Sequence, residues 1–187
     1  EQLYQTMSFK DITLKEISTV TSFSRPTIYN YFQTKEEIFL ALFEREYDRW
    51  NEDLEKILSS DKAFSRTELA EQIAKSLERR KQLLKLLSMN NYDMEENSRE
   101  ELLASFKRAY GKSLTLFREI LRKHVSGMSD AEVEQIMYVF FPFMFGIYPY
   151  AEVTAKQKDA MKEAGVDYKY QTIYEITYNC LNRLLKN

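Results

Sequence analysis

A short segment near the start of the chain carries polar side chains that could contact another molecule. The sequence SRPTIYNYFQTK, residues 24–35, supplies a guanidinium, several hydroxyls, two amides and an ammonium. If this segment is a helix, Ile28 and Phe32 lie four residues apart on its inward face. The outward positions are then Arg25, Thr27, Tyr29, Asn30 and Tyr31, with Lys35 just beyond the helix. Such groups can reach base edges and phosphates in a DNA major groove.

The preceding residues predict how this segment is held. We expect a helix over residues 14–20, with an apolar stripe of Leu14, Ile17 and Val20. A turn follows, with Phe23 as its buried anchor. Ser24 is a suitable N-cap for a helix over residues 25–32, and Pro26 falls in its first turn, where a missing N–H group costs little. Together these features predict a helix-turn-helix.

Helix starts are marked elsewhere by Ser or Thr followed three residues later by Glu or Gln, a capping box that satisfies two free backbone N–H groups. The pattern occurs at Thr13–Glu16, Thr34–Glu37, Ser65–Glu68, Ser98–Glu101, Ser129–Glu132 and Thr154–Gln157. With the apolar periodicity, it predicts helices over residues 14–20, 25–32, 35–58, 66–89, 98–125, 129–150, 154–164 and 169–185. No useful β-alternation is present. The sequence therefore predicts an all-α fold.

Composition divides the chain into two parts. Residues 1–44 form a compact trio of short helices, the expected DNA-binding domain, whose first helix we expect to be truncated. Residues 45–187 form a larger helical body rich in Met and aromatic residues. The net charge of −2 argues against nonspecific coating of nucleic acid, whereas residues 13–35 carry three basic side chains and one acidic one.

The location of the protein is predicted from its cysteine content and its longest apolar run. Cys180 is the only cysteine, which excludes an internal disulfide and fits a reducing cytoplasm. The run from residue 136 to 150 is too short to span a bilayer and contains two prolines. We therefore expect a cytoplasmic protein with no membrane partner.

The N-terminal region also carries a longer pattern: Phe9, Ile12, Thr13, Glu16, Ile17, Phe23, Ser24, Thr27, Ile28, Tyr29, Tyr31, Phe32 and the run Thr34 to Phe39. This pattern, from about Leu3 to Leu42, resembles the TetR family of bacterial transcriptional regulators. Departures are modest: Ser18 replaces the usual alanine, Phe23 stands where valine is usual, and Tyr31 replaces a common histidine. The resemblance covers only the first part of the chain.

The resemblance implies particular roles at the matching positions. Thr13 would contact a DNA phosphate at the start of its helix. Lys35 would bind a phosphate at the start of the long helix, where an ammonium and free N–H groups favour an anion. The residues that would face DNA are Ser24, Arg25, Thr27, Tyr29, Asn30 and Tyr31. For Tyr29 and Tyr31 the alternative is packing against neighbouring helices.

The body contains an unusually apolar segment, YVFFPFMFGIYPYAEV, residues 138–153. A helix that is apolar all round must be covered on every side, which favours a subunit contact on one face and a core or cavity on the other. Pro142 should kink this helix. By resemblance, the helices near 129–150 and 169–185 would form a homodimer. The second would use a stripe of Tyr170, Ile173, Tyr174, Thr177, Leu181 and Leu184.

The resemblance also implies a small-molecule effector in the body, of hydrophobic or amphipathic character. Aromatic and Met side chains make adaptable apolar walls. The candidates are Trp50, Met89, Tyr92, Met94, Phe106, Tyr110, Phe117, Phe141, Met144, Phe145 and Tyr148. At helical spacing, such residues can equally be simple core.

Other functional classes find little support in the sequence. His124 and Cys180 each lack companion residues for catalysis or metal binding, and no phosphate-binding loop or nucleophile motif is present. We expect no enzyme activity, no cofactor and no metal. The hypothesis is a homodimeric, ligand-responsive DNA-binding transcriptional regulator that represses from a palindromic operator and is released by a hydrophobic small molecule. The alternative is a helical small-molecule-binding protein or dimeric adaptor that retains the helix-turn-helix as a scaffold.

Overall fold

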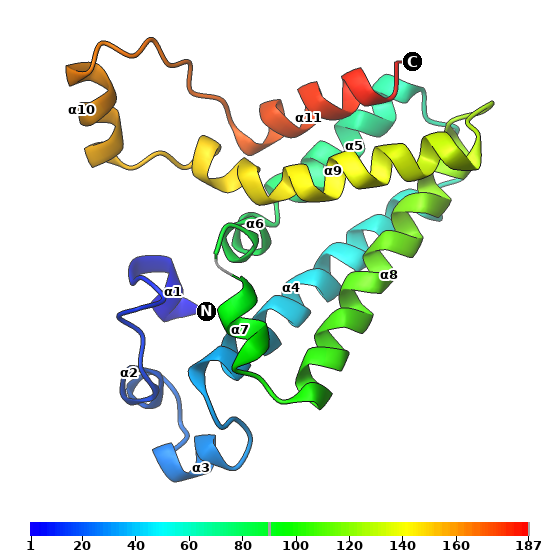
Figure 1. The fold of residues 1–187 in the computed structure, drawn as a ribbon. Coiled ribbons are helices and arrows are strands. Elements are labelled where there is room, and N and C mark those ends of the chain that lie inside the picture. The colour runs from blue at the N-terminus through cyan, green and yellow to red at the C-terminus, as the bar shows by residue number, and fades with distance from the viewer. Residues whose placement is uncertain (90, 187) are drawn as a thin grey trace. The chain divides into compact units, whose positions relative to one another are not determined.

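The structure, a computed structural model, describes residues 1–89 and 91–186. Within these ranges every regular element is a helix, which confirms the predicted fold class (Figure 1). The elements are α1 (Gln2–Thr6), α2 (Leu14–Thr19), α3 (Arg25–Tyr29), α4 (Lys35–Leu58), α5 (Arg66–Glu78), α6 (Lys81–Leu87), α7 (Asn91–Glu96), α8 (Glu100–His124), α9 (Asp130–Ala151), α10 (Ala155–Glu163) and α11 (Ile173–Leu184).

The helices group into two compact units. The described residues of the first are 1–45 and 91–108, and those of the second are 46–89 and 109–186. The division within α4 lies one residue from the predicted domain boundary. However, residues 91–108, which the sequence division placed in the body, belong to the first unit. The pairing of Phe106 with Phe43, at 4.9 Å between ring centroids, is one contact that holds them there.

The capping pattern predicted several helix starts correctly. Full capping boxes are present at Ser65, Ser129 and Thr154. Ser98 does not cap a helix in this way, because α8 begins at Glu100 and the Ser98 hydroxyl donates to the Met94 carbonyl at 2.7 Å. A further capping box at Thr172 begins the last helix, so α11 starts at Ile173 and not at the predicted residue 169.

The predicted helix over residues 66–89 is broken. Helix α5 ends at Glu78 and α6 begins at Lys81, with Arg80 in a non-helical conformation between them. The Arg80 Nε donates to the carboxylate of buried Asp53 at 2.9 Å. This ion pair reaches back to α4, and neither glycine nor proline marks the break in the sequence. Helix α7 was also not predicted.

The core of the second unit surrounds the middle of α4. Trp50 is fully buried, and its indole N–H donates to the Ser76 hydroxyl of α5 at 3.0 Å. Buried Asn51 donates to the Ala109 carbonyl of α8 at 3.0 Å and accepts from the Ser113 hydroxyl at 2.6 Å. These bonds satisfy polar groups that would otherwise be costly to bury.

Helix α11 packs mainly against α5 and also contacts α9 (Figure 1). Its inward stripe consists of Ile173, Thr177 and Leu181, which are all buried within the chain. The predicted assignment of these three residues to a subunit contact is therefore wrong, because the same 3,4 spacing serves the protein's own core. Tyr170 lies outside α11, in the segment before it.

Candidate nucleic-acid interface

Helix α3 has the local structure that the sequence predicts, although it is shorter. The Ser24 hydroxyl accepts the Thr27 N–H at 3.4 Å, and Pro26 lies in the first turn. Ile28 is the buried residue of the helix. The helix ends at Tyr29, and the backbone continues with turn-type hydrogen bonds to Phe32. One apolar residue thus anchors a helix whose other positions are available for contact.

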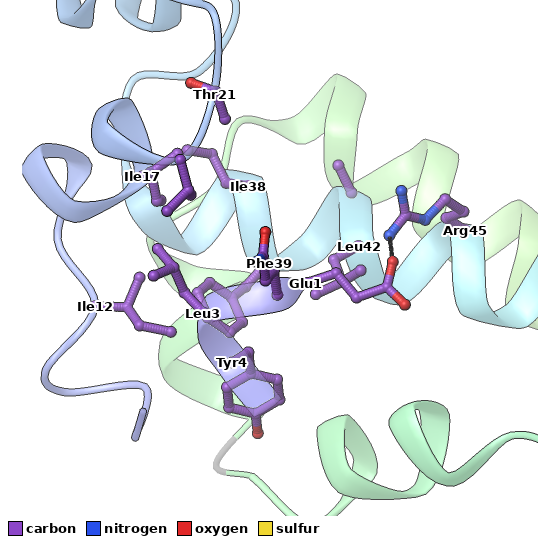
Figure 2. A pocket seen from close by; sticks show the side chains of 13 residues that line it. Glu1, Leu3, Tyr4, Ile12, Ile17, Thr21, Ile38, Phe39, Leu42 and Arg45 are labelled. Carbon is purple, nitrogen blue, oxygen red and sulfur yellow. Dashed lines mark hydrogen bonds and ion pairs between the residues drawn. The ribbon is translucent and has the colours of Figure 1, made fainter. Parts of the chain in front are cut away.

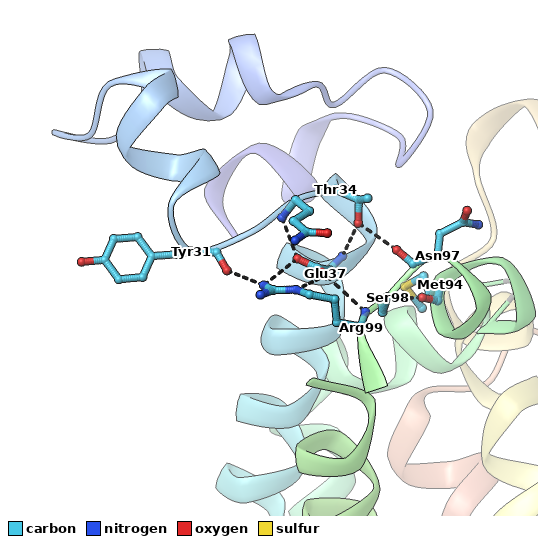
Figure 3. Close-up of polar contacts among 8 residues, drawn as sticks. Tyr31, Thr34, Glu37, Met94, Asn97, Ser98 and Arg99 are labelled. Atoms are coloured by element: carbon cyan, nitrogen blue, oxygen red, sulfur yellow. Dashed lines mark hydrogen bonds and ion pairs between the residues drawn. The ribbon is translucent and has the colours of Figure 1, made fainter. Parts of the chain in front are cut away.

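The predicted outward residues are mostly exposed. Arg25 and Asn30 are exposed, and Thr27 is half-buried. The Tyr29 and Tyr31 side chains are 54% and 67% exposed, so neither ring is packed into the core of this unit. Figure 3 shows the Tyr31 ring extending away from the polar cluster beside it. Most of these side chains are thus accessible to a partner, although contact with DNA remains a prediction.

Two predictions about the helix-turn-helix core are wrong. Phe23 is 56% exposed and Val20 is 46% exposed, so neither anchors the turn. Helix α2 ends at Thr19, which leaves Val20 as its C-cap outside the regular helix. Ile12, just before the helix, is buried instead. Apolar residues spaced three or four apart do not predict the buried face correctly where the helix is only six residues long.

Thr13 caps helix α2. Its hydroxyl oxygen accepts the N–H groups of Lys15 and Glu16, at 3.2 and 3.4 Å, and the hydroxyl donates to the Glu16 carboxylate. The hydroxyl therefore has a structural role at the helix start. Its contact with a DNA phosphate remains a prediction.

Lys35 joins the start of α4 to the segment before α2. Its ammonium donates to the carbonyls of Phe9, at 2.9 Å, and Ile12, at 3.3 Å. It also lies 4.2 Å from the centroid of the Phe9 ring. Two of its three N–H groups are thus used within the unit, and one remains for the predicted phosphate contact.

A cavity of about 350 Å³ lies in the first unit between α1, α2 and α4 (Figure 2). Leu3, Ile17 and Phe39 line it, and an ion pair between Arg45 and Glu1, 2.5 Å long, lies at its edge. None of the residues predicted to line an effector pocket contributes to it.

The predicted effector-pocket residues do not form one group. Three of them, on α4 and α8, surround a fourth, Phe141 of α9. The ring of Phe141 lies 6.0 Å from Trp50, 6.0 Å from Tyr110 and 5.6 Å from Phe117. We call Trp50, Tyr110, Phe117 and Phe141 the aromatic cluster. Met144 is fully buried on the same helix as Phe141.

The other candidates differ from these four in their surroundings and burial. Phe106 packs against Phe43 in the first unit with the two rings tilted, and Met94 is also buried in that unit. Tyr92, on α7, is 86% exposed and Phe145 is also exposed, while Met89 and Tyr148 are half-buried. Two other cavities of the second unit, of about 350 and 280 Å³, are lined by neither Trp50 nor its cluster partners.

Helix α9 presents a second accessible surface. Large apolar side chains on it remain uncovered in the single chain, namely Tyr138, Val139, Phe145 and Tyr150. Among the described residues, no single helix is both long and apolar enough to cross a membrane; α9 and α10 reach that length only as a pair bent by 81°. In the same residues, no group of three or more potential ligands is arranged to hold a metal ion.

Models of known sequence families match both the N-terminal part and the body of the chain. A family model described as "Bacterial regulatory proteins, tetR family" matches residues 1–42, and one described as "Tetracyclin repressor-like, C-terminal domain" matches residues 44–169. The chain belongs to the TetR family. It is therefore a DNA-binding transcriptional regulator and not an enzyme. A search of curated proteins found no match.

This membership identifies residues 1–42, which contain α3, as the helix-turn-helix DNA-binding domain. The sequence predicts α3 and its cap, but it does not predict a contact that supports the end of this helix. Arg99, which precedes α8, bonds to the segment that follows α3. The two lie 68 residues apart in sequence, and no helical period or motif connects positions at that separation.

Proposed function

We propose that this TetR-family protein is a homodimeric repressor that binds a palindromic operator and is released by a hydrophobic small molecule. The observation that carries the DNA-binding part is the surface of α3, with Ile28 buried beneath it. Arg25 and Asn30 would read base edges, since a guanidinium suits guanine and an amide suits adenine. The remaining proposed DNA contacts are those of Thr13, Ser24, Thr27, Tyr29, Tyr31 and Lys35.

The proposed homodimer rests on the uncovered apolar surface of α9. Tyr138 is 79% exposed, and Val139 and Tyr150 accompany it. On α11, the rings of Tyr174 and Tyr178 stack at 5.8 Å, and both are half-exposed. A second copy that covers these aromatic residues would remove a large apolar area from water. A two-fold dimer would present two copies of α3 to the two half-sites of a palindrome.

The dimer is tested by placing a charge on the exposed face of α9. Val139→Glu should produce a monomer, because the carboxylate would be buried without a partner in the dimer. Thr115→Glu, at an exposed position of α8, is the matched control and should remain dimeric. Sedimentation velocity reports the mass, and circular dichroism checks that both variants keep their helices. A dimeric Val139→Glu variant would contradict the use of this face.

The proposed effector site is the aromatic cluster of the second unit. Its aromatic walls suit an apolar ligand, which would have to displace close ring contacts in order to enter. Trp50 is the only tryptophan of the chain, so its fluorescence reports directly on the cluster. Release of DNA requires that the ligand bind the DNA-free conformation more tightly than the DNA-bound one.

The effector proposal can be tested with a panel of uncharged aromatic compounds. An effector at the cluster should change Trp50 emission and weaken operator binding over the same concentration range. A compound that weakens operator binding while Trp50 emission stays constant would place the effector elsewhere. A compound that tightens operator binding would contradict release as the mode of control.

We further propose that the protein acts in the cytoplasm. A bacterial transcriptional regulator must reach chromosomal DNA, and the single half-buried Cys180 is compatible with reducing conditions.

A further inference from the structure

The segment between α7 and α8 contacts the residues that follow the recognition helix α3. At the centre of the contact is Glu37, in the first turn of α4, which is only 1% exposed (Figure 3). Its carboxylate accepts from Arg99 Nε at 2.8 Å, from Arg99 Nη2 at 3.1 Å and from the Arg99 backbone N–H at 3.2 Å. It also accepts the Gln33 N–H at 2.6 Å.

Two further hydrogen bonds extend this contact to the end of α3. Arg99 Nη2 donates to the Tyr31 carbonyl at 2.8 Å, and the Thr34 hydroxyl donates to the Asn97 carbonyl at 3.0 Å. Tyr31 lies two residues beyond the end of α3, and Thr34 directly precedes α4. Arg99 and Asn97 therefore hold both ends of the short segment that joins these helices.

The chemistry of the contact requires arginine at this position. A buried carboxylate without partners is costly, whereas several N–H donors satisfy its lone pairs. Burial by itself raises the pKa of Glu37, but the bonds from Arg99 and the Gln33 N–H outweigh it and hold that pKa below its ordinary value. The planar guanidinium can serve the carboxylate and the Tyr31 carbonyl together, which a lysine ammonium cannot do with the same geometry.

We propose that Arg99 is a positioning residue for sequence-specific DNA recognition. It fixes the exit of α3 against the first turn of α4 and makes no contact with DNA itself. Base readout depends on the angle at which α3 enters the groove, whereas nonspecific binding depends chiefly on the number of phosphate contacts. Loss of Arg99 should therefore weaken specific binding selectively. The proposal rests on the proposed operator-binding function.

The test compares Arg99→Ala, Arg99→Lys and a control, Arg108→Ala. Arg108 is exposed on α8, and its side chain has no hydrogen-bond or ion-pair partner within the described part of the chain. Binding to a selected operator and to a random duplex would be measured over a range of salt concentrations. Arg99→Ala should weaken operator binding by roughly tenfold or more, the effect of losing one or two charge-assisted bonds. Binding to the random duplex should be unchanged.

Arg99→Lys and two variants at Glu37 separate positioning from charge. Arg99→Lys retains the positive charge but loses the planar guanidinium with its several N–H donors. Its operator affinity should therefore lie between those of the wild type and Arg99→Ala. Glu37→Gln should also weaken operator binding. The double variant Glu37→Gln, Arg99→Ala should bind the operator only slightly more weakly than either single variant, because both substitutions remove the same contact. Arg108→Ala should bind the operator like the wild type.

Three results would overturn the inference. The first is an Arg99→Ala variant with unchanged operator affinity. The second is a salt slope that falls by about 0.9, the value for one lost phosphate contact, because Arg99 would then touch DNA directly. The third is an Arg99→Lys variant that binds like the wild type. By contrast, a folded wild-type protein that selects no DNA sequence would contradict the proposed function itself, and the inference with it.

Discussion

Replacement of Lys35 by methionine would separate its structural role from its predicted role on DNA. Methionine keeps an apolar stem of similar length but removes the ammonium. The two carbonyls of Phe9 and Ile12 would lose a charged donor, and the Phe9 ring would lose its cation. Hydrogen bonds to charged groups contribute about 1.5–3 kcal/mol when buried, and an exposed cation–π contact about 0.5–1 kcal/mol.

Because Lys35 is only half-buried, solvent reduces these values. We expect a total loss of roughly 1.5–2 kcal/mol, which corresponds to a fall in melting temperature of about 3–8 °C for a chain of this size. Circular dichroism during heating would measure it. If the remaining N–H group also contacts a phosphate, the slope of log K against log salt should fall by about 0.9.

The matched control for this variant is Lys162→Met, which removes the same charge from an exposed position of α10. It should change neither the melting temperature nor the salt slope. An unchanged melting temperature for Lys35→Met would refute the structural argument for Lys35. A lower melting temperature with an unchanged slope would refute the phosphate contact alone.

Three other substitutions test the structure more locally. Ser129→Ala removes the capping box that begins α9 and should cost about 1 kcal/mol, seen as a fall of roughly 2–4 °C in melting temperature. Glu37→Gln removes a carboxylate whose pKa is lowered in the folded protein. The ionised carboxylate therefore stabilises the folded protein above the ordinary glutamate pKa of about 4.3, and this stabilisation is lost as the pH falls through the lowered pKa. The difference in unfolding free energy between the wild type and Glu37→Gln should therefore shrink as the pH falls below about 4.3, and a constant difference would contradict this assignment. Trp50→Phe removes the donor to buried Ser76 and leaves a cavity, so it should destabilise the protein by about 2–3 kcal/mol in urea unfolding.

Local signals in the sequence predicted most of the helices and the recognition surface. The Ser24 cap, Pro26 in the first turn and buried Ile28 together predicted α3 and the positions that it leaves exposed. Capping boxes located the starts of α5, α9 and α10 for the same reason, since each depends only on residues three apart.

Apart from the capping box at Thr172, the features that the sequence does not predict depend on contacts between distant residues or on how short helices pack. The break before α6 coincides with the bond from Arg80 to Asp53, 27 residues earlier. The exposure of Phe23 and the burial of Ile12 depend on how short helices pack, which a six-residue pattern does not determine. Of the predicted pocket residues, only the four of the aromatic cluster, on α4, α8 and α9, contact one another. The type of a residue predicts that it lies in an apolar environment, but it does not predict which residues surround it.

The most direct test of the account is selection of duplex DNA from a random pool with the wild-type protein, followed by measurement of the salt dependence of binding to the selected sequences. A dimeric operator-binding protein should select an inverted repeat, whose half-sites each bind one copy of α3, and its affinity for that repeat should fall steeply with salt. A folded dimer that enriches no sequence would contradict it. The surface formed by Arg25, Tyr29, Asn30 and Tyr31 would then serve a purpose other than operator recognition.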